Sequence, residues 1–124
     1  MVALSFDAGV LVALERRDSR AWAWMRRATE REVPPVVSTA ALAEAWRGRR
    51  QMWLANALRG CEIVPVSDTL ARAAGVACGT TGAAALDAII AATAATRGAT
   101  LLTADLEDMN ALAGHFRSLR VVAL

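Results

Sequence analysis

The sequence contains no lysine, one histidine and two cysteines, and these scarcities exclude several kinds of site. His115 has no histidine or cysteine partner at metal-ligand spacing, which argues against a zinc site and against a pair of catalytic histidines. Cys61 and Cys78 form neither a C-x-x-C motif nor a zinc-type pair, so we expect free thiols in a cytoplasmic protein. There is also no nucleophile motif for Ser/His/Asp catalysis. Any chemistry must therefore come from other residue types.

The sequence also lacks an apolar run long enough to span a bilayer. The longest such stretch, residues 83–96, is interrupted by Asp87 and is expected to be a buried helix. The amino-terminal run lacks the charged leader of a signal peptide, and glycine and proline are too scattered to indicate a linker. With 124 residues, 56% of them hydrophobic, we expect one domain over residues 1–124 with a single core and no membrane contact.

All 14 basic residues are arginine, and the chain has a net charge of +2 and a pI near 9.0. The planar guanidinium group suits phosphate oxygens. Arginine clusters are usually only solvated surface, so they favour RNA binding weakly. The two clusters are Arg26, Arg27 and Arg31, and Arg47, Arg49 and Arg50.

Short apolar runs alternate with helical patterns along the chain. The expected strands are 2–6, 36–37, 61–66, 100–103 and 120–124. The expected helices are 9–16, 19–31, 39 to about 47, 49–59, 68–77, 84–97 and 106–114, with residues 79–82 as a loop. Fully apolar strands alternating with helices indicate an α/β fold of three layers, α/β/α, with a central parallel sheet of about five short strands.

Four carboxylates interrupt or end these apolar segments. Asp7 and Asp105 each follow an expected strand, Asp87 lies near the start of an apolar helix, and Glu44 lies on the helix after the second strand. Because the carboxyl ends of parallel strands share one edge, all four can face one crevice. Buried carboxylates are costly unless they are paired or bind a cation, and hard cations such as Mg²⁺ prefer oxygen ligands. The pattern predicts a metal site for phosphoryl-transfer chemistry, acting on nucleic acid.

Most of these acids also have a purely structural explanation. Asp7 could cap the helix that begins near Ala8. Asp105 could cap residues 106–114, with Asp108 as the acidic third position of a capping box. Glu44 could form a helical ion pair with Arg47. Asp87, with apolar neighbours on both sides, is the hardest to explain in this way.

Four segments resemble, in order, those of PIN-domain ribonucleases and specifically of VapC-type toxins. They are residues 5–14 (SFDAGVLVAL), 37–48 (VSTAALAEAWRG), 87–94 (DAIIAATA) and 101–108 (LLTADLED). The resemblance covers the whole chain. It implies a PIN-like fold and a metal-dependent endoribonuclease toxin that hydrolyses RNA with a metal-activated water, using Mg²⁺ or alternatively Mn²⁺.

The resemblance also implies roles for individual residues and for partners. The metal-binding acidic quartet is expected at Asp7, Glu44, Asp87 and Asp105, with Thr103 orienting the metal or its water and Asp108 as an auxiliary acid. The expected partners are RNA, a small antitoxin that covers the active site, and a second toxin subunit in a homodimer.

Two further expectations come from the residues themselves. Arg47, one helical turn beyond Glu44, could hold a substrate phosphate or simply pair with Glu44. Trp22 and Trp24 point to nearly opposite faces of the expected helix 19–31, so one is expected at the surface as an antitoxin or subunit contact; alternatively, neighbouring helices cover both.

Two other classes of protein are alternatives. A catalytically silent PIN module would bind RNA or a protein partner without cleaving. A receiver-like signalling domain also gathers acids at strand ends, but it needs a lysine that this chain lacks.

Overall fold

The structure is a computed structural model, and it describes residues 2–48 and 50–124. Five parallel strands form one sheet in the order β3-β2-β1-β4-β5. The central strand β1 (Leu4–Phe6) pairs with β2 (Val36–Ser38) and β4 (Thr100–Thr103), while β3 (Glu62–Val64) and β5 (Arg120–Ala123) form the two edges. The expected α/β fold with a parallel sheet is confirmed.

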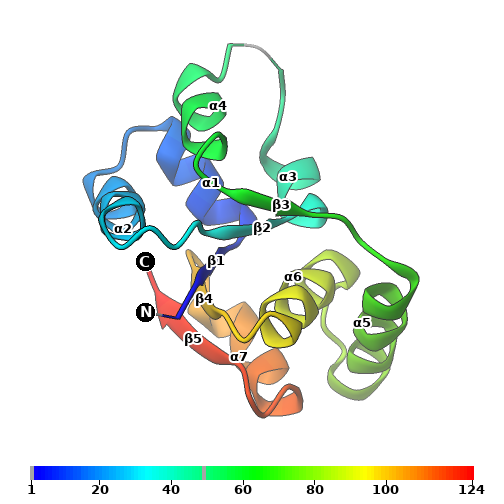
Figure 1. Cartoon of the computed structure of the whole chain (residues 1–124). Coiled ribbons are helices and arrows are strands. Elements are labelled where there is room, and N and C mark those ends of the chain that lie inside the picture. The colour runs from blue at the N-terminus through cyan, green and yellow to red at the C-terminus, as the bar shows by residue number, and fades with distance from the viewer. Residues whose placement is uncertain (1, 49) are drawn as a thin grey trace.

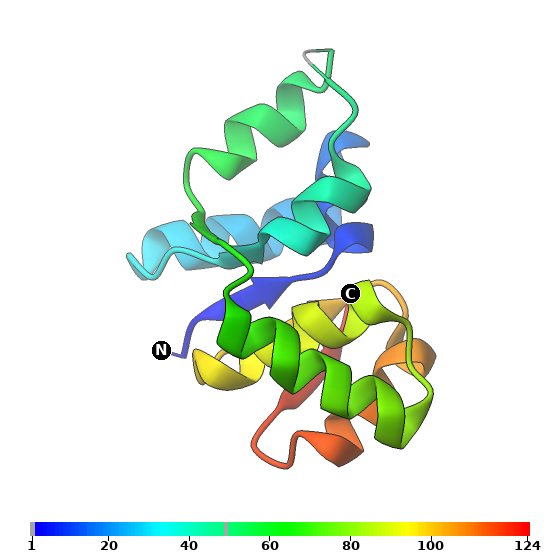
Figure 2. The same cartoon turned by 90° about the vertical axis from the view of Figure 1, so that its right-hand side faces the viewer.

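Helices cover both faces of this sheet (Figures 1 and 2). One face carries α1 (Ala8–Glu15), α2 (Ser19–Glu30), α3 (Thr39–Ala45) and α4 (Met52–Leu58). The other face carries α5 (Asp68–Thr81), α6 (Ala85–Thr96) and α7 (Leu106–His115). Helix α3 also contacts α6, so the two layers meet beside the sheet.

The core forms where the central strands meet these helices. Phe6, Val37, Leu101 and Leu102 are fully buried because β1, β2 and β4 have helices on both faces. Helix α6 faces them with alanines, which allow the helix to approach the sheet closely. Its buried residues are Ala88, Ile90, Ala91, Ala92, Thr93 and Ala94. Residues 84–97 were expected to form this helix, and they do so with only small differences at the ends.

Helix α5 continues through residues 79–81, so the expected loop there is wrong. The hydroxyl groups of Thr80 and Thr81 donate to the Val76 and Ala77 carbonyls one turn back, at 3.1 and 2.8 Å. These bonds satisfy threonines that would otherwise compete with the helix. The helix ends at Gly82, which adopts the left-handed conformation (φ 75°) that favours glycine.

The connection between α3 and α4 is longer than expected, since α3 ends at Ala45 and α4 begins at Met52. The Gln51 side chain holds this connection: its amide donates to the Ala45 carbonyl (2.8 Å) and its oxygen accepts from the backbone N–H of Arg47 (2.5 Å) and of Gly48 (3.2 Å). The expected helical positions 46, 47, 50 and 51 are therefore wrong, and position 49 lies outside the described residues.

Trp22 and Trp24 are both half-buried against the core, so each keeps part of its ring exposed. The partner contact expected of one of them stays a prediction. The Trp22 indole N–H donates to the Leu14 carbonyl at 2.9 Å, which ties α2 to α1. The tryptophans with the larger exposed fractions are Trp46 (37%) and Trp53 (47%).

Within the described residues, no single helix is long and apolar enough to cross a membrane, and α5 with α6 reaches that length only across a 119° bend.

Candidate metal centre at the carboxyl edge of the sheet

The topology places a switch point at the carboxyl ends of β1 and β4. From β1 the chain moves to β2 and β3 on one side, whereas β4 and β5 lie on the other side. Ligands of open parallel sheets bind at such a switch point. Asp7 directly follows β1, and the pairing of Phe6 with Leu102 places it beside Thr103 at the end of β4.

Asp7 is held by three hydrogen-bond donors and is only 5% exposed. The Val10 N–H donates to Oδ1 at 2.9 Å, which makes Asp7 the N-cap of α1 as expected. The Thr103 hydroxyl donates to Oδ2 at 2.5 Å, and the Ala104 N–H donates to Oδ2 at 3.2 Å. A carboxylate accepts about four hydrogen bonds, so this group keeps about one acceptor position for another ligand.

Thr103 and Gly9 bring the two sides of the switch point together. The buried Thr103 hydroxyl also accepts from the Asp105 N–H at 2.9 Å, so it links Asp7 to the loop that carries Asp105. A Cβ on Gly9 would lie 2.5 Å from the Ala104 Cβ, so only glycine allows this loop to approach α1. Gly9 was not predicted as a site residue; the available signal was a glycine two residues after a strand-end aspartate.

Glu44 and Asp87 lie near Asp7 on helices α3 and α6, which cover opposite faces of the sheet. Burial raises the pKa of Glu44, and the negative charges of Asp87 and Asp7 raise it further against the opposing charge of Arg47. Burial likewise raises the pKa of Asp87, followed by the charges of Asp108, Asp7 and Asp105. The four predicted acids are therefore electrostatic neighbours.

Asp105 and Asp108 form an exposed pair at the start of α7. The Asp108 N–H donates to Asp105 Oδ1 at 3.2 Å, so the expected capping role of Asp105 is confirmed. A side-chain hydrogen bond to Asp105 raises the pKa of Asp108, and the Asp105 charge adds to this. Capping and a place in the acidic cluster therefore occur together in both Asp7 and Asp105.

Arg47 is exposed and does not form the expected ion pair with Glu44 within the described part of the chain. Its guanidinium donates to the carbonyls of Ala43 (3.2 Å) and Trp46 (2.7 Å) at the end of α3. Its charge still lies close enough to oppose the rise in the pKa of Glu44.

The donor set suits a hard divalent cation in its chemistry, because every acid offers only carboxylate oxygens. In residues 2–48 and 50–124, however, no three histidine, cysteine, aspartate or glutamate side chains are gathered into a group that could hold a metal ion as they stand. Mg²⁺ keeps several waters and needs only one or two direct carboxylate ligands. The residues present therefore fit Mg²⁺ better than a cation that requires a closed protein cage.

Comparison with solved structures gives matches along nearly the whole chain. A chain from a toxin–antitoxin complex of Klebsiella pneumoniae is 25% identical, with a TM-score of 0.73 and coverage of 97% of this chain and 95% of that one. VapBC2 from Rickettsia felis, bound to a promoter DNA fragment, contains a chain that is 15% identical, with a TM-score of 0.72 and 98% coverage of both chains.

FitAcB from Neisseria gonorrhoeae contains a match with a lower TM-score of 0.60, which is 22% identical and covers 95% of both chains. The matches below 25% identity show a shared fold. Comparison with curated protein sequences gives no match. The family model described as PIN domain matches residues 5–114, a range that includes all the candidate acids. This chain belongs to the PIN domain family.

Proposed function

We propose that this protein is a VapC-type toxin, a metal-dependent endoribonuclease that hydrolyses RNA phosphodiester bonds. The observation that carries the proposal is the group of acids at the switch point, where burial raises the pKa values of Glu44 and Asp87 and the charges of neighbouring carboxylates raise them further. Like charges held together without a cation oppose ionisation, and a divalent cation relieves this repulsion.

The four acids Asp7, Glu44, Asp87 and Asp105 are the proposed Mg²⁺ ligands, with Mn²⁺ as a substitute. When bound, such an ion lowers the pKa of a water and stabilises the charge that develops on the phosphate. Thr103 and the Ala104 N–H fix the direction of the Asp7 carboxylate.

The remaining candidates support this arrangement. Asp108 is the proposed auxiliary acid, because it shares a hydrogen bond with Asp105. Arg47 is the proposed phosphate contact. It is exposed, and rotation of its guanidinium away from the Ala43 and Trp46 carbonyls would free it for substrate.

The proposed partners follow from the structural neighbours. Several of these neighbours come from toxin–antitoxin complexes, which supports a small antitoxin as the regulatory partner of this chain. We also propose a homodimer as the free toxin, and the cytoplasm as its location.

Cleavage of an unstructured, end-labelled RNA by the purified protein tests the proposal. The wild type should cleave in Mg²⁺ and stop in EDTA. Asp87→Asn should lose at least about a hundredfold in rate, since it removes a direct ligand where even supporting residues cost 10–100-fold. The matched control is Asp68→Asn, an exposed acid on α5 that pairs with Arg72. Equal cleavage by Asp87→Asn and wild type would refute the proposed quartet.

A catalytically silent module is the second candidate, favoured by the absence of a closed group of three ligands in the described residues. The same assay separates the two functions. A silent module would retain RNA in a binding assay and leave it intact in Mg²⁺ or Mn²⁺.

A further inference from the structure

The segment from Ala45 to Cys61 differs in charge from the rest of the chain. It contains four arginines and no acidic residue. Because the whole chain has a net charge of +2, the remaining residues carry a net charge of −2. A local concentration of positive charge attracts a polyanion, and here it lies next to a site built from carboxylates.

The same segment leaves large apolar side chains exposed. Trp46 is 37% exposed, Met52 74% and Trp53 47%. Exposed tryptophans among arginines are the combination with which proteins bind single-stranded nucleic acid, because bases stack on the rings and phosphates contact the guanidinium groups.

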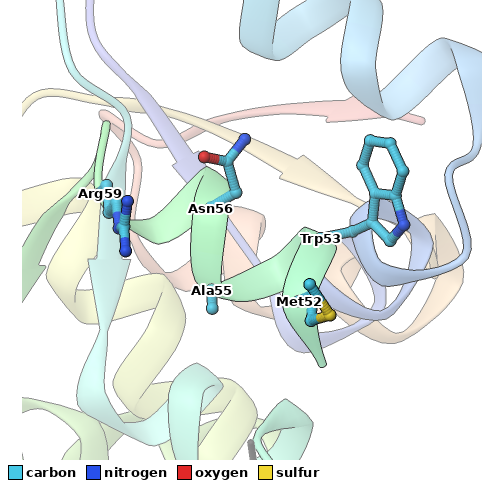
Figure 3. Close-up of a pocket in the computed structure, with 5 residues that line it drawn as sticks. All are labelled: Met52, Trp53, Ala55, Asn56 and Arg59. Atoms are coloured by element: carbon cyan, nitrogen blue, oxygen red, sulfur yellow. The ribbon is translucent and has the colours of Figure 1, made fainter. Parts of the chain in front are cut away.

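A groove of about 490 Å³ runs along α4 and is lined by Met52, Trp53, Ala55, Asn56 and Arg59 (Figure 3). In Figure 3 the Trp53 and Arg59 side chains lie toward opposite ends of the helix. The groove therefore offers an aromatic ring at one end and a guanidinium group at the other, with the Asn56 amide between them.

Contacts from α1 and α2 hold this helix in place. The Leu54 N–H donates to the Glu15 carboxylate at 2.7 Å. The Trp53 ring meets Trp22 edge to face, with ring centroids 6.1 Å apart, and the Arg17 guanidinium lies 5.4 Å from the Trp53 centroid. The groove is thus formed before any ligand arrives, which lowers the entropic cost of binding.

The charged groups of this surface are available to a ligand. Within the described residues, the guanidinium groups of Arg50 and Arg59 make no hydrogen bond or ion pair, and both residues are exposed. The surface begins at Trp46, two residues beyond Glu44 at the end of α3, so this end of the surface adjoins the acids.

We propose that residues 46–48 and 50–59 form the surface that binds single-stranded RNA, with unpaired bases against Trp46 and Trp53 and phosphates at Arg50 and Arg59. This inference rests on the proposed function for the adjoining site. A strand is favoured over a duplex because the exposed rings offer stacking to bases that are not already stacked. RNA is favoured over a protein partner because the segment carries only positive charge.

Fluorescence anisotropy with a labelled, unstructured RNA tests this surface, in an Asp87→Asn background that keeps the RNA intact. Arg50→Gln with Arg59→Gln should weaken binding at least about tenfold and reduce the salt slope by about 1.4, or about 0.7 for each lost phosphate contact. The matched control, Arg117→Gln with Arg120→Gln, removes the same charge from an exposed turn and edge strand and should change affinity by less than about twofold.

Trp53→Leu should weaken binding about fivefold or more, and Trp53→Phe should retain most of it, because the phenyl ring still stacks. Trp53→Phe also keeps an aromatic contact with Trp22, which separates lost stacking from lost folding. A blunt RNA duplex should bind more weakly than the strand.

Equal loss of affinity in the arginine pair and its control would overturn this inference. So would unchanged RNA affinity together with a change in the oligomeric size of the protein, which would identify a protein interface. The cleavage assay distinguishes failure of the proposed function from failure of the proposed surface. If wild type binds RNA through this surface but never cleaves it, the proposed function is wrong and the surface is retained. If it cleaves and the arginine pair binds normally, the surface fails and the function stands.

Discussion

Asp7 and Asp87 are both candidate ligands, yet their surroundings differ. Asp7 accepts hydrogen bonds from three donors, whereas Asp87 is half-buried near the other acids and its pKa is raised by burial and by their charges. A neutral amide therefore has a different consequence at each position, although both changes remove a proposed ligand.

Asp7→Asn should destabilise the metal-free protein by about 1–2 kcal/mol, because the amide nitrogen must face a hydrogen-bond donor. Asp87→Asn should stabilise it, because the substitution removes a repelled charge. Thermal unfolding of both variants in EDTA near neutral pH measures these opposite signs. If both variants unfold at the same temperature as wild type, the hydrogen bonds and repulsion described here do not affect stability.

Ser5 is the other notable polar residue of β1, since its buried hydroxyl has no hydrogen-bond partner in the described chain. Ser5→Ala should leave stability unchanged or raise it by about 1 kcal/mol, because an unsatisfied buried hydroxyl is costly.

Ser38→Ala is the matched control for Ser5→Ala. This equally buried serine caps α3 through a hydrogen bond from the Ala40 N–H at 3.1 Å, so its removal should cost about 1 kcal/mol. Urea unfolding measures both changes; a larger loss for Ser5→Ala than for Ser38→Ala would contradict the assignment.

At the scale of elements, helix α2 ends with a charged residue where glycine is usual. Glu32 has φ of 56°, and the Val33 N–H donates to the Ala28 carbonyl at 3.1 Å, the pattern of a left-handed helix cap. A non-glycine residue in this conformation costs about 1–2 kcal/mol.

Glu32→Gly should therefore stabilise the protein by up to about 1 kcal/mol, the lower part of that cost. Glu30→Gly, two residues earlier and still helical, should instead destabilise by about 0.5–1 kcal/mol. Thermal unfolding of the two variants provides the comparison, and loss of stability in Glu32→Gly would show that its side chain contributes more than its backbone costs.

The elements that sequence predicted well are those defined by apolar runs bounded by caps, such as α6 and the buried strands. The elements that the sequence did not predict depend on side chains that form hydrogen bonds with the backbone. The hydroxyl groups of Thr80 and Thr81 extend α5 through residues that were expected to form a loop. The Gln51 side chain stabilises a non-helical connection where the apolar periodicity predicted a helix. No local pattern of apolar residues carries this information.

The candidate site likewise contains residues that the sequence predicted and residues that it missed. Asp7 and Asp105 could be predicted from the strand ends, because parallel topology alone places them at one edge of the sheet. The contact of Gly9 with Ala104 and the double role of the Thr103 hydroxyl depend on atoms that are distant in sequence. Such contacts require the folded chain to be known.

At the scale of the whole molecule, the acidic cluster makes stability depend on pH. The pKa values of Glu44 and Asp87 are raised above the ordinary 4.5 and 3.8. Between the ordinary and the raised values, the folded protein binds more protons than the unfolded chain. Stability contributed by these groups is therefore present below the ordinary pKa and is lost as pH rises through the raised pKa.

Urea unfolding of the metal-free protein, followed from below the ordinary pKa values of these groups up to neutral pH, should show this loss, and Asp87→Asn should show a smaller one. Asp68→Asn, which changes an exposed acid paired with Arg72, should follow wild type. Identical pH profiles for wild type and Asp87→Asn would mean that the acidic cluster does not couple protonation to folding.

The most direct test of the central claim is calorimetric titration of Mg²⁺ into wild type, Asp87→Asn and Asp68→Asn in the absence of RNA. The claim is that the acids at the carboxyl edge form a divalent-cation site. Wild type and Asp68→Asn should bind Mg²⁺ saturably and with equal affinity, while Asp87→Asn should bind at least about tenfold more weakly. Absence of saturable binding to wild type, or equal affinity in all three proteins, would contradict the claim.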